Sequence, residues 1–529
     1  MFDYLIKNGQ LIDGTGSPAR RADVGITDGK IAAIGDLSAA QAGTVIDAAG
    51  KTVTPGFIDI HRHADAALCR PHFGELELKQ GLTTIVNGNC GLSITPCSGP
   101  YRGEIEAYLT PVTGELSADA DCSSMQAYLD AARRQPSPIH TAMLAGSGTI
   151  RACAAGFSAP TLDAAQLRTV RSLIERELAA GALGVSLGLG YAPDCFYSTE
   201  TLIEALRPLQ DSGIPITVHM RQEGSGVVGA LQEMIAVARA LRTPVEISHL
   251  KSIGKANWRS CTPEMLRLMA EARQEGVRIA CDVYPYTAGS TQLVHVLPPE
   301  TQQGGMEALT EHLADPAFRE TLKARMLTGS DFENISLLAG FENIVVSSVR
   351  LDGLRQYEGQ SIAQIAEQQG KDPFTCLFDL LQAAHCDVTM IDFIAAEDDI
   401  CDILRDAHSC VISDSTYPTT GMLHPRVYGT YTTLLEHLVR EKQVLSLEAA
   451  VHKVTGRPAA VMGLRTKGVL AQGMDADINI FDPAQIHTRA TYQDPAQFSD
   501  GLDTVFVSGQ PAILHGALTG RKDGTVLTR

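Results

Sequence analysis

The sequence predicts an α/β fold built on a parallel (β/α)8 barrel of the TIM type. Three observations support this prediction. Short apolar strands alternate with amphipathic helical segments, the alternation repeats eight times, and β segments of another kind occupy both ends of the chain. An open doubly wound sheet is the main alternative, but no Gly-x-Gly-x-x-Gly segment follows the first strand. We therefore expect a barrel, a small β domain built from both termini, and a subdomain inserted after strand seven.

Composition limits the classes of function. The 529 residues are 44% apolar and 20% charged, as in soluble globular proteins. The net charge of −18 argues against a nucleic-acid partner, because phosphates require an excess of Lys and Arg. We see no signal-peptide pattern and no apolar run near the ~20 residues that span a bilayer. The twelve cysteines include no Cys-x-x-Cys pair and indicate free thiols in a reducing compartment, so we expect a cytoplasmic protein. The oligomeric state is not predicted.

Residues 1–56 are expected to form the N-terminal part of the small β domain. Residues 3–12 alternate loosely between apolar and polar side chains. Residues 24–34 indicate a hairpin with Asp28 and Gly29 at its turn, a common pair at two-residue turns. Residues 465–529 should complete this domain, because β signals return at 468–470, 476–482 and 504–507.

Residues 57–464 are expected to form the barrel. Its eight predicted strands are Phe57–Ile60, Thr83–Val86, Thr141–Leu144, Leu183–Leu187, Ile214–Val218, Val245–Ile247, Arg278–Val283 and Ser409–Ile412. Helical segments such as 167–178 and 227–241 carry apolar residues on one face between them. The gap after strand seven is far longer than an ordinary βα connection, so we expect residues 287–405 to contain an insertion over the barrel mouth that acts as a lid.

Metal-ligating side chains follow five of the predicted strands. His61 and His63 come directly after strand one, and their i, i+2 spacing turns both side chains to one face. Cys90 follows strand two, and three other such residues follow strands five, six and eight: His219, His249 and Asp414. Each residue alone is more often a packing, capping or hydrogen-bonded residue. Their joint position at the mouth, where barrel enzymes carry out their chemistry, predicts a metal centre.

The ligand set favours zinc, which prefers imidazole and thiolate ligands and keeps an open position for water in catalytic sites. Cys90, His219 and His249 provide one complete three-ligand site, and we expect it to bind zinc tightly because the thiolate neutralises part of the metal charge. His61, His63 and Asp414 provide a second, looser site beside it.

The same framework resembles the amidohydrolase superfamily. Many members bridge two metals with a modified lysine at the end of strand four, but residues 183–188 here contain no Lys. A cysteine after strand two is similar instead to the D-aminoacylase branch, the N-acyl-D-amino-acid deacylases. Shared segments are Gly88-Asn89-Cys90-Gly91, Gly190-Tyr191, Ser248-His249-Leu250-Lys251, Asp282-Val283-Tyr284-Pro285-Tyr286 and His424-Pro425-Arg426. Two positions depart from the pattern: Arg62 stands where a small residue is common, and Ser415 where Gly is common.

The resemblance implies a reaction and roles for residues. The enzyme would hydrolyse the amide bond of an N-acyl-D-amino acid, with zinc-activated water and Asp414 as the proton shuttle. Lys251, Tyr284 and Arg426 would bind the substrate's free α-carboxylate, with Tyr191 nearby. Arg221 is a weaker candidate, for which a surface ion pair is the alternative. The D configuration follows only from the resemblance.

The resemblance also bears on the substrate side chain. Relatives that act on N-acyl-D-glutamate carry an extra arginine after strand seven, whereas residues 287–300 here contain no Arg or Lys. We therefore expect a neutral or apolar side chain on the substrate.

Two other readings of the function stay open. The same scaffold supports other amidohydrolase reactions, such as opening a cyclic amide or removing a carbamoyl group. A non-catalytic barrel that serves as a binding module is the alternative from another class. That alternative expects the loss of one or more ligands, whereas all six positions are filled here.

Overall fold

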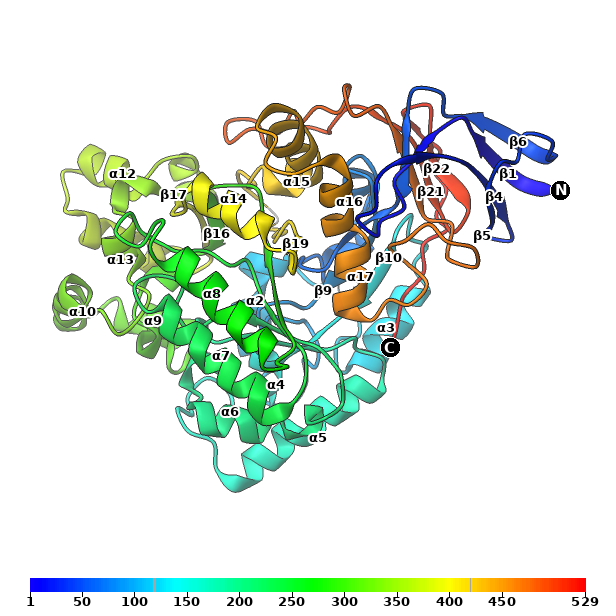
Figure 1. Cartoon of the computed structure of the whole chain (residues 1–529). Helices are drawn as coiled ribbons and strands as arrows, with labels where there is room; N and C mark the ends of the chain where they lie inside the picture. Colours follow the sequence, from blue (N-terminus) through cyan, green and yellow to red (C-terminus); the bar gives the residue numbers. More distant parts are fainter. Residues whose placement is uncertain (118–119, 419) are drawn as a thin grey trace.

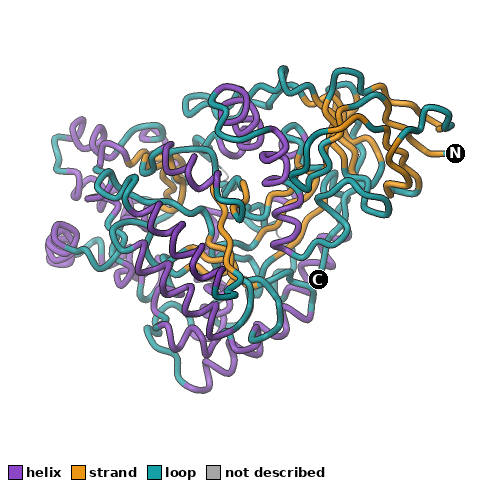
Figure 2. Tube along the Cα trace, viewed as in Figure 1, coloured by secondary structure: helices purple, strands orange, loops and turns teal. Residues whose placement is uncertain are grey.

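The structure, a computed structural model, describes residues 1–117, 120–418 and 420–529. Strands lie near the centre of the molecule, with helices outside them (Figures 1 and 2). The barrel strands are β8 (Phe57–Asp59), β9 (Leu82–Asn87), β10 (His140–Met143) continued by β11 (Ala145–Gly146), β12 (Val185–Gly188), β13 (Ile216–His219), β14 (Val245–Ile247), β15 (Ile279–Val283) and β19 (Ser409–Val411). All eight predicted strands are therefore present.

The strands close into a barrel in chain order. Parallel pairing runs from β8 through β9 to β10, and from β11 through β12, β13, β14 and β15 to β19. The ring closes where β19 returns to β8. There Arg62 bridges to Ser415, and the Asp414 amide donates a 2.9 Å hydrogen bond to the carbonyl of His61. The closed parallel sheet confirms the predicted fold class and brings the segments after strands one and eight together.

The outer helices pack through apolar faces that the sequence predicts. In α7 (Val227–Leu241), the side chains of Val227, Leu231, Ile235, Ala238 and Leu241 are all buried. The other α-helices outside the inserted subdomain are α1 (Glu75–Leu78), α2 (Arg102–Thr113), α3 (Met125–Arg133), α4 (Ser147–Ala155), α5 (Ala164–Ala179), α6 (Thr199–Ala205), α8 (Cys261–Gln274), α14 (Glu397–Arg405), α15 (Arg426–Thr433), α16 (Leu447–Val454) and α17 (Gly456–Met462). Among the described residues, no helix is both long and apolar enough to cross a bilayer.

The small β domain combines both ends of the chain. Its seven-stranded sheet has the order β23 (Ala517–Leu518), β22 (Gln510–Leu514), β21 (Leu502–Val507), β20 (Ile478–Phe481), β7 (Thr52–Pro55), β2 (Gln10–Leu11) and β3 (Arg20–Arg21). A second sheet has the order β5 (Lys30–Gly35), β4 (Asp23–Thr27), β1 (Phe2–Lys7) and β6 (Ala42–Asp47). The predicted hairpin turn is confirmed, with positive φ at Asp28 (50°) and Gly29 (72°).

One predicted β segment is wrong, because residues 468–470 form no strand. Gly468 has φ +82°, and a Cβ there would lie 2.7 Å from the carbonyl oxygen of Thr455. This close approach to the end of α16 fits a loop.

The inserted subdomain covers the barrel mouth. It contains an antiparallel sheet in the order β16 (Ala288–Gln292), β18 (Val388–Phe393) and β17 (Ile344–Val349). Its helices are α9 (Gly305–His312), α10 (Pro316–Thr328), α11 (Ile335–Leu338), α12 (Ile362–Gln369) and α13 (Pro373–Ala383). A hydrophobic core of its own spans residues 293–390. Its residues Ser290, His295 and Asp392 line the same pocket as His219 and His249, so it forms the roof of the mouth. The residue boundaries of the domains stay predictions.

Candidate active site

Four of the six predicted ligands form one compact cluster. One ligand atom each from His61, Cys90, His249 and Asp414 lies within 4.8 Å of every other. Cys90 Sγ is 3.2 Å from His61 Nε2 and 3.5 Å from His249 Nε2. All four residues are buried, although they are separated by as many as 353 positions along the chain (414 − 61). The barrel thus brings together side chains that the sequence places on four different strands.

The remaining two predicted ligands adjoin this cluster. His219 Nδ1 lies 3.2 Å from His249 Nε2, so Cys90, His249 and His219 form one continuous contact set. His63 Nε2 lies 3.3 Å from Asp414 Oδ1. All six predicted ligands therefore meet at one end of the barrel. How they divide between two ions stays a prediction.

Three of these residues hold unusual backbone conformations. The φ angles of Cys90, His249 and Asp414 are +54°, +36° and +51°, in the left-handed region that costs non-glycine residues free energy. The path of the loop at Cys90 also depends on a glycine of β12, because a Cβ at Gly188 would lie 2.1 Å from the Cys90 carbonyl oxygen. The end of strand four therefore has no room for a side chain beside Cys90. A lysine side chain at position 188 would therefore collide with the Cys90 loop.

The surroundings of Cys90 favour the thiolate form of its side chain. Burial raises its pKa, but the nearby imidazoles of His61, His219 and His249 outweigh burial and hold that pKa well below its usual value. A thiolate is the form that ligates metals.

Asp414 stands between the histidines and an arginine. Its Oδ1 is 3.4 Å from His61 Nε2, and its Oδ2 is 2.9 Å from Arg426 Nη1. Burial raises the pKa of this carboxyl, but the Arg426 guanidinium and the hydrogen bond with His63 hold the pKa well below its usual range. Asp414 is thus an ionised base with a fixed orientation.

Glu223 orients one of the imidazoles. Its Oε1 lies 2.8 Å from His249 Nδ1, the ring nitrogen that faces away from Cys90, and its Oε2 accepts a 2.5 Å bond from Lys251 Nζ. Glu223, His219 and His249 also have ligand atoms within 4.8 Å of one another. The Lys251 ammonium already neutralises Glu223, so we assign Glu223 a positioning role. A carboxylate on the far nitrogen of a histidine ligand fixes its tautomer and ring orientation.

The two departures from the family pattern have local explanations. Arg62 is fully buried and turns away from the cluster. Its guanidinium lies 3.1 Å from Asp59 and 3.0 Å from Glu77, which ties β8 to α1. Ser415 stands where Gly is common, but the residue with a positive φ is Asp414 and not Ser415. Glycine is therefore not required at position 415.

The candidate substrate residues fall into two groups. Two cations lie near the Tyr284 ring, with Lys251 Nζ 5.8 Å and Arg426 Cζ 4.9 Å from its centroid. Tyr191 packs against His219 with ring centroids 4.4 Å apart. Arg221 is separate from this group, since its guanidinium pairs with Glu233 at 3.0 Å and does not line the pocket that contains Asp414. Arg221 thus forms an ion pair, as its alternative role expects, but the pair is partly buried and not at the surface; a role for Arg221 in substrate binding stays a prediction.

Sequence reasoning missed several polar residues at the mouth. Glu223 lies only four positions after His219, but it sits in a loop where no periodicity marks it. Asp282 accepts a bond from the His249 amide, and its Oδ2 lies 3.6 Å from His61 Nδ1. Glu333 and Asp392 come from the inserted subdomain and reach the pocket only through tertiary packing. Asp282 alone had a signal in the sequence, because it is the next-to-last residue of strand seven and therefore lies close to the mouth.

The cluster fits zinc. Two ligands bound to tetrahedral zinc at about 2.0–2.3 Å lie roughly 3.3–3.7 Å apart. The N···S and N···N separations of 3.2, 3.5 and 3.2 Å among His61, Cys90, His249 and His219 are close to that spacing. The donor set of imidazoles and a thiol with a lowered pKa is also the one that zinc prefers.

Comparisons match this chain to known proteins over its whole length. A model of the amidohydrolase family matches residues 44–513. A D-aminoacylase from Alcaligenes xylosoxydans xylosoxydans is 34% identical over 532 residues, covering 100% of this chain and 98% of that protein. An N-acyl-D-glutamate deacylase from Bordetella bronchiseptica, solved with zinc and a phosphonate that mimics the tetrahedral intermediate, matches with TM-score 0.84 and 32% identity over 100% of both chains. A D-aminoacylase structure concerned with its binuclear metal centre matches with TM-score 0.83 and 32% identity, again over 100% of both chains.

Proposed function

The chain belongs to the amidohydrolase family, and from that premise we propose that it hydrolyses the amide bond of N-acyl-D-amino acids. The products are a carboxylate and the free D-amino acid. The observation that carries the proposal is the convergence of Cys90, His61, His249 and Asp414 within 4.8 Å at the barrel mouth. A thiolate, imidazoles and an ionised carboxylate in one buried cluster are the parts that metal-assisted hydrolysis requires.

The cofactor is zinc. Cys90, His219 and His249 would hold one ion tightly, and the remaining three residues would hold a second more loosely: His61, His63 and Asp414. Bound zinc lowers the pKa of water and polarises the acyl carbonyl. The spacing of the ligand atoms and the lowered pKa of the Cys90 thiol support this assignment.

Asp414 moves the proton. Its carboxylate accepts a proton from the attacking water and then delivers that proton to the departing amine nitrogen, which is otherwise a poor leaving group. Arg426 keeps Asp414 ionised through the 2.9 Å contact with Oδ2, and this contact leaves Oδ1 directed toward His61 and His63. The base is thus ionised and oriented before substrate arrives.

Lys251, Tyr284 and Arg426 bind the substrate's α-carboxylate. The Lys251 ammonium and the Arg426 guanidinium lie 5.8 and 4.9 Å from the centroid of the buried Tyr284 ring. A carboxylate near the Tyr284 hydroxyl would therefore lie within the field of both. Because Arg426 also contacts Asp414, the same guanidinium links the position of the substrate to that of the base.

The acidic lining of the pocket selects the substrate side chain. Glu223, Glu333 and Asp392 line the pocket, and Lys251 is the one Lys or Arg among its described lining residues. Lys251 is already paired with Glu223. An acidic side chain would meet like charge here, so we propose that the enzyme prefers neutral or apolar side chains.

A reducing compartment is also proposed. The eleven cysteines whose side chains the structure describes are all free thiols. This supports, as a proposal, the cytoplasmic location expected from the sequence.

The test of the proposed function is amine release from paired N-acetyl-D- and N-acetyl-L-amino acids, with and without a chelator. We expect turnover of the D enantiomer, which the chelator abolishes and added zinc restores. Failure of the metal-replete protein to turn over either enantiomer would refute the assignment.

A further inference from the structure

A large cleft opens at the end of the barrel opposite the metal cluster. Its walls are the loops that lead into β12, β13, β14, β15 and β19, together with α17, residues 463–467 and residues 527–529. These loops precede their strands, so the cleft lies at the N-terminal face of the barrel. We call it the basal cleft. Its volume of about 1050 Å³ is slightly above the range of about 300–1,000 Å³ that is usual for ligand pockets, so the cleft has room for a small molecule.

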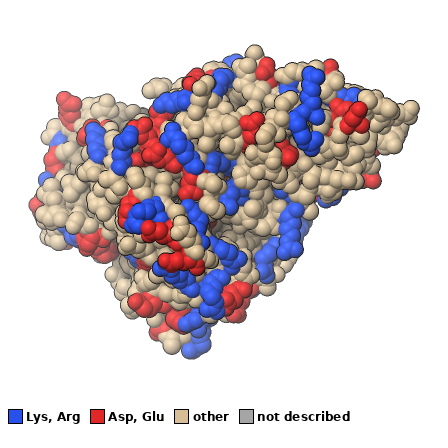
Figure 3. Space-filling view, in the orientation of Figure 1, with Lys and Arg blue, Asp and Glu red and all other residues tan. Residues whose placement is uncertain are grey.

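The basal cleft is basic although the chain carries a net charge of −18. Its described lining residues include one acidic side chain, Glu246, and six basic ones: Arg273, Arg278, Arg457, Arg465, Lys467 and Arg529. Lys and Arg side chains gather around the middle of the face shown in Figure 3. An electropositive hollow in an acidic protein concentrates anions locally, whatever the total charge.

Two of the six cations are already neutralised. Arg273 pairs with Asp406 at 2.7 Å, and Lys467 pairs with Asp477 at 2.6 Å. These pairs also neutralise two acids near the cleft.

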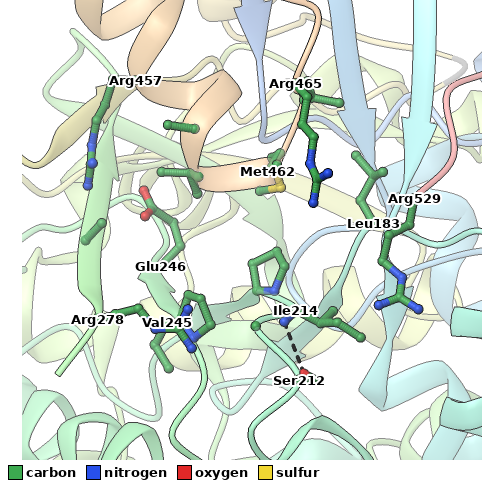
Figure 4. A pocket seen from close by; sticks show the side chains of 18 of the residues that line it. Leu183, Ser212, Ile214, Val245, Glu246, Arg278, Arg457, Met462, Arg465 and Arg529 are labelled. Carbon is green, nitrogen blue, oxygen red and sulfur yellow. Dashed lines mark hydrogen bonds between the residues drawn. The ribbon is translucent and has the colours of Figure 1, made fainter.

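The other four cations, all guanidinium groups, stay available. Among the described residues, Arg278, Arg457, Arg465 and Arg529 form no ion pair. Arg278 and Arg457 each donate one hydrogen bond to a backbone carbonyl, at 3.0 and 3.2 Å, and the Nε of Arg457 is buried without a partner in the described part of the chain. Figure 4 shows Arg278 and Arg457 on one side of the cleft and Arg465 on the other. Opposed guanidinium groups present forks that match carboxylate and phosphate oxygens.

Glu246 adds a second, independent sign of a missing ligand. Its side chain is 1% exposed, and neither carboxyl oxygen has a hydrogen-bond partner in the described structure. It borders the cleft on the side of Arg457 (Figure 4). Burial and the nearby charge of Asp282 raise the pKa of Glu246 well above its usual value, so this carboxyl carries an O–H group without a partner. Buried polar groups are normally satisfied, and an acceptor oxygen of an anion in the cleft would satisfy this donor.

We propose that the basal cleft binds a small organic anion with more than one charged oxygen, of the carboxylate or phosphate class. Arg278, Arg457 and Arg465 bind its charged groups. Its carbon skeleton packs against an apolar wall that includes Leu183, Ile214 and Met462. The inference does not depend on the proposed hydrolysis, because no residue of the basal cleft belongs to the metal cluster.

The test is calorimetric titration of the zinc-loaded protein with inorganic phosphate and, separately, with succinate at constant ionic strength. The variant is Arg278→Gln/Arg465→Gln. Both side chains are exposed and form no ion pair with any described residue, so the fold should be preserved. The matched control is Arg134→Gln/Arg168→Gln, which removes the same charge from exposed positions that do not line the cleft.

We expect saturable binding of at least one anion, weakened about tenfold or more by the double variant and unchanged in the control. Tighter binding of phosphate than of succinate identifies the phosphate class, and the reverse order identifies the carboxylate class. Two results would overturn the proposal. One is the absence of saturable binding of either anion below about 10 mM. The other is equal affinity in the double variant and its control.

Discussion

Replacement of Asp414 by asparagine tests the chemical core of the mechanism. Asn has the same shape but neither accepts the proton of water nor returns it to the amine. Loss of a general acid–base group costs about 10²- to 10⁴-fold in rate, or roughly 3–5 kcal/mol of transition-state stabilisation. The contact between Asp414 Oδ2 and Arg426 Nη1, at 2.9 Å, would also lose its charge. Arg426 is fully buried, so part of the measured effect would be structural.

A matched control separates the two contributions. Asp406→Asn weakens a partly buried pair with Arg273, at 2.7 Å, at a site remote from the metal cluster. We expect both variants to lose stability in urea unfolding, and only Asp414→Asn to lose kcat/KM on the N-acetyl-D-amino acid. Zinc measured by mass spectrometry should stay bound at Cys90, His219 and His249. If Asp414→Asn retained more than about one tenth of wild-type kcat/KM, Asp414 would not be the proton shuttle.

Three other outcomes follow from single contacts. Glu223→Gln should weaken zinc binding about 10- to 100-fold in a competitive chelator titration, because Gln holds the His249 ring less firmly. The control Glu233→Gln changes a residue that pairs with Arg221, and it should leave zinc affinity unchanged. Wild-type protein should favour N-acetyl-D-leucine over N-acetyl-D-glutamate by at least about tenfold in kcat/KM. Asp392→Asn removes an acidic group from the pocket, so it should reduce this ratio of kcat/KM values. An unchanged ratio would show that Asp392 does not contribute to substrate selectivity. Burial raises the pKa of Asp477, but His140 and Lys467 outweigh burial and depress it, so this carboxylate stabilises the fold above about pH 4 and loses that effect as pH falls further. Asp477→Asn should therefore lower the free energy of unfolding by about 3–5 kcal/mol at pH 7 and by less below about pH 4.

The barrel was predictable because its signals are local. Each strand is a short apolar run, and α7 shows its buried face in the spacing of Val227, Leu231 and Ile235. The convergence of His61, Cys90, His249 and Asp414 followed from one rule, that parallel strands of a barrel end at the same rim. The sequence also contains the hairpin at Asp28 and Gly29, because the turn needs positive φ at both positions.

The rest depends on tertiary packing. Glu333 and Asp392 reach the mouth only because the inserted subdomain folds back over it. Arg62 departs from the expected small residue between two histidines, and its partner Glu77 on α1 is brought to it only by tertiary packing. The basal cleft is formed by residues from loops and chain segments as far apart as 183 and 527, and no local pattern unites them.

X-ray absorption at the zinc edge tests the central claim most directly, because that claim is that Cys90 and the mouth histidines share one ion. For wild-type protein loaded with one equivalent of zinc, we predict one sulfur neighbour at about 2.3 Å with nitrogen or oxygen neighbours at about 2.0–2.1 Å. In Cys90→Ser the sulfur neighbour should disappear. A wild-type spectrum without sulfur, or one that Cys90→Ser leaves unchanged, would contradict the account.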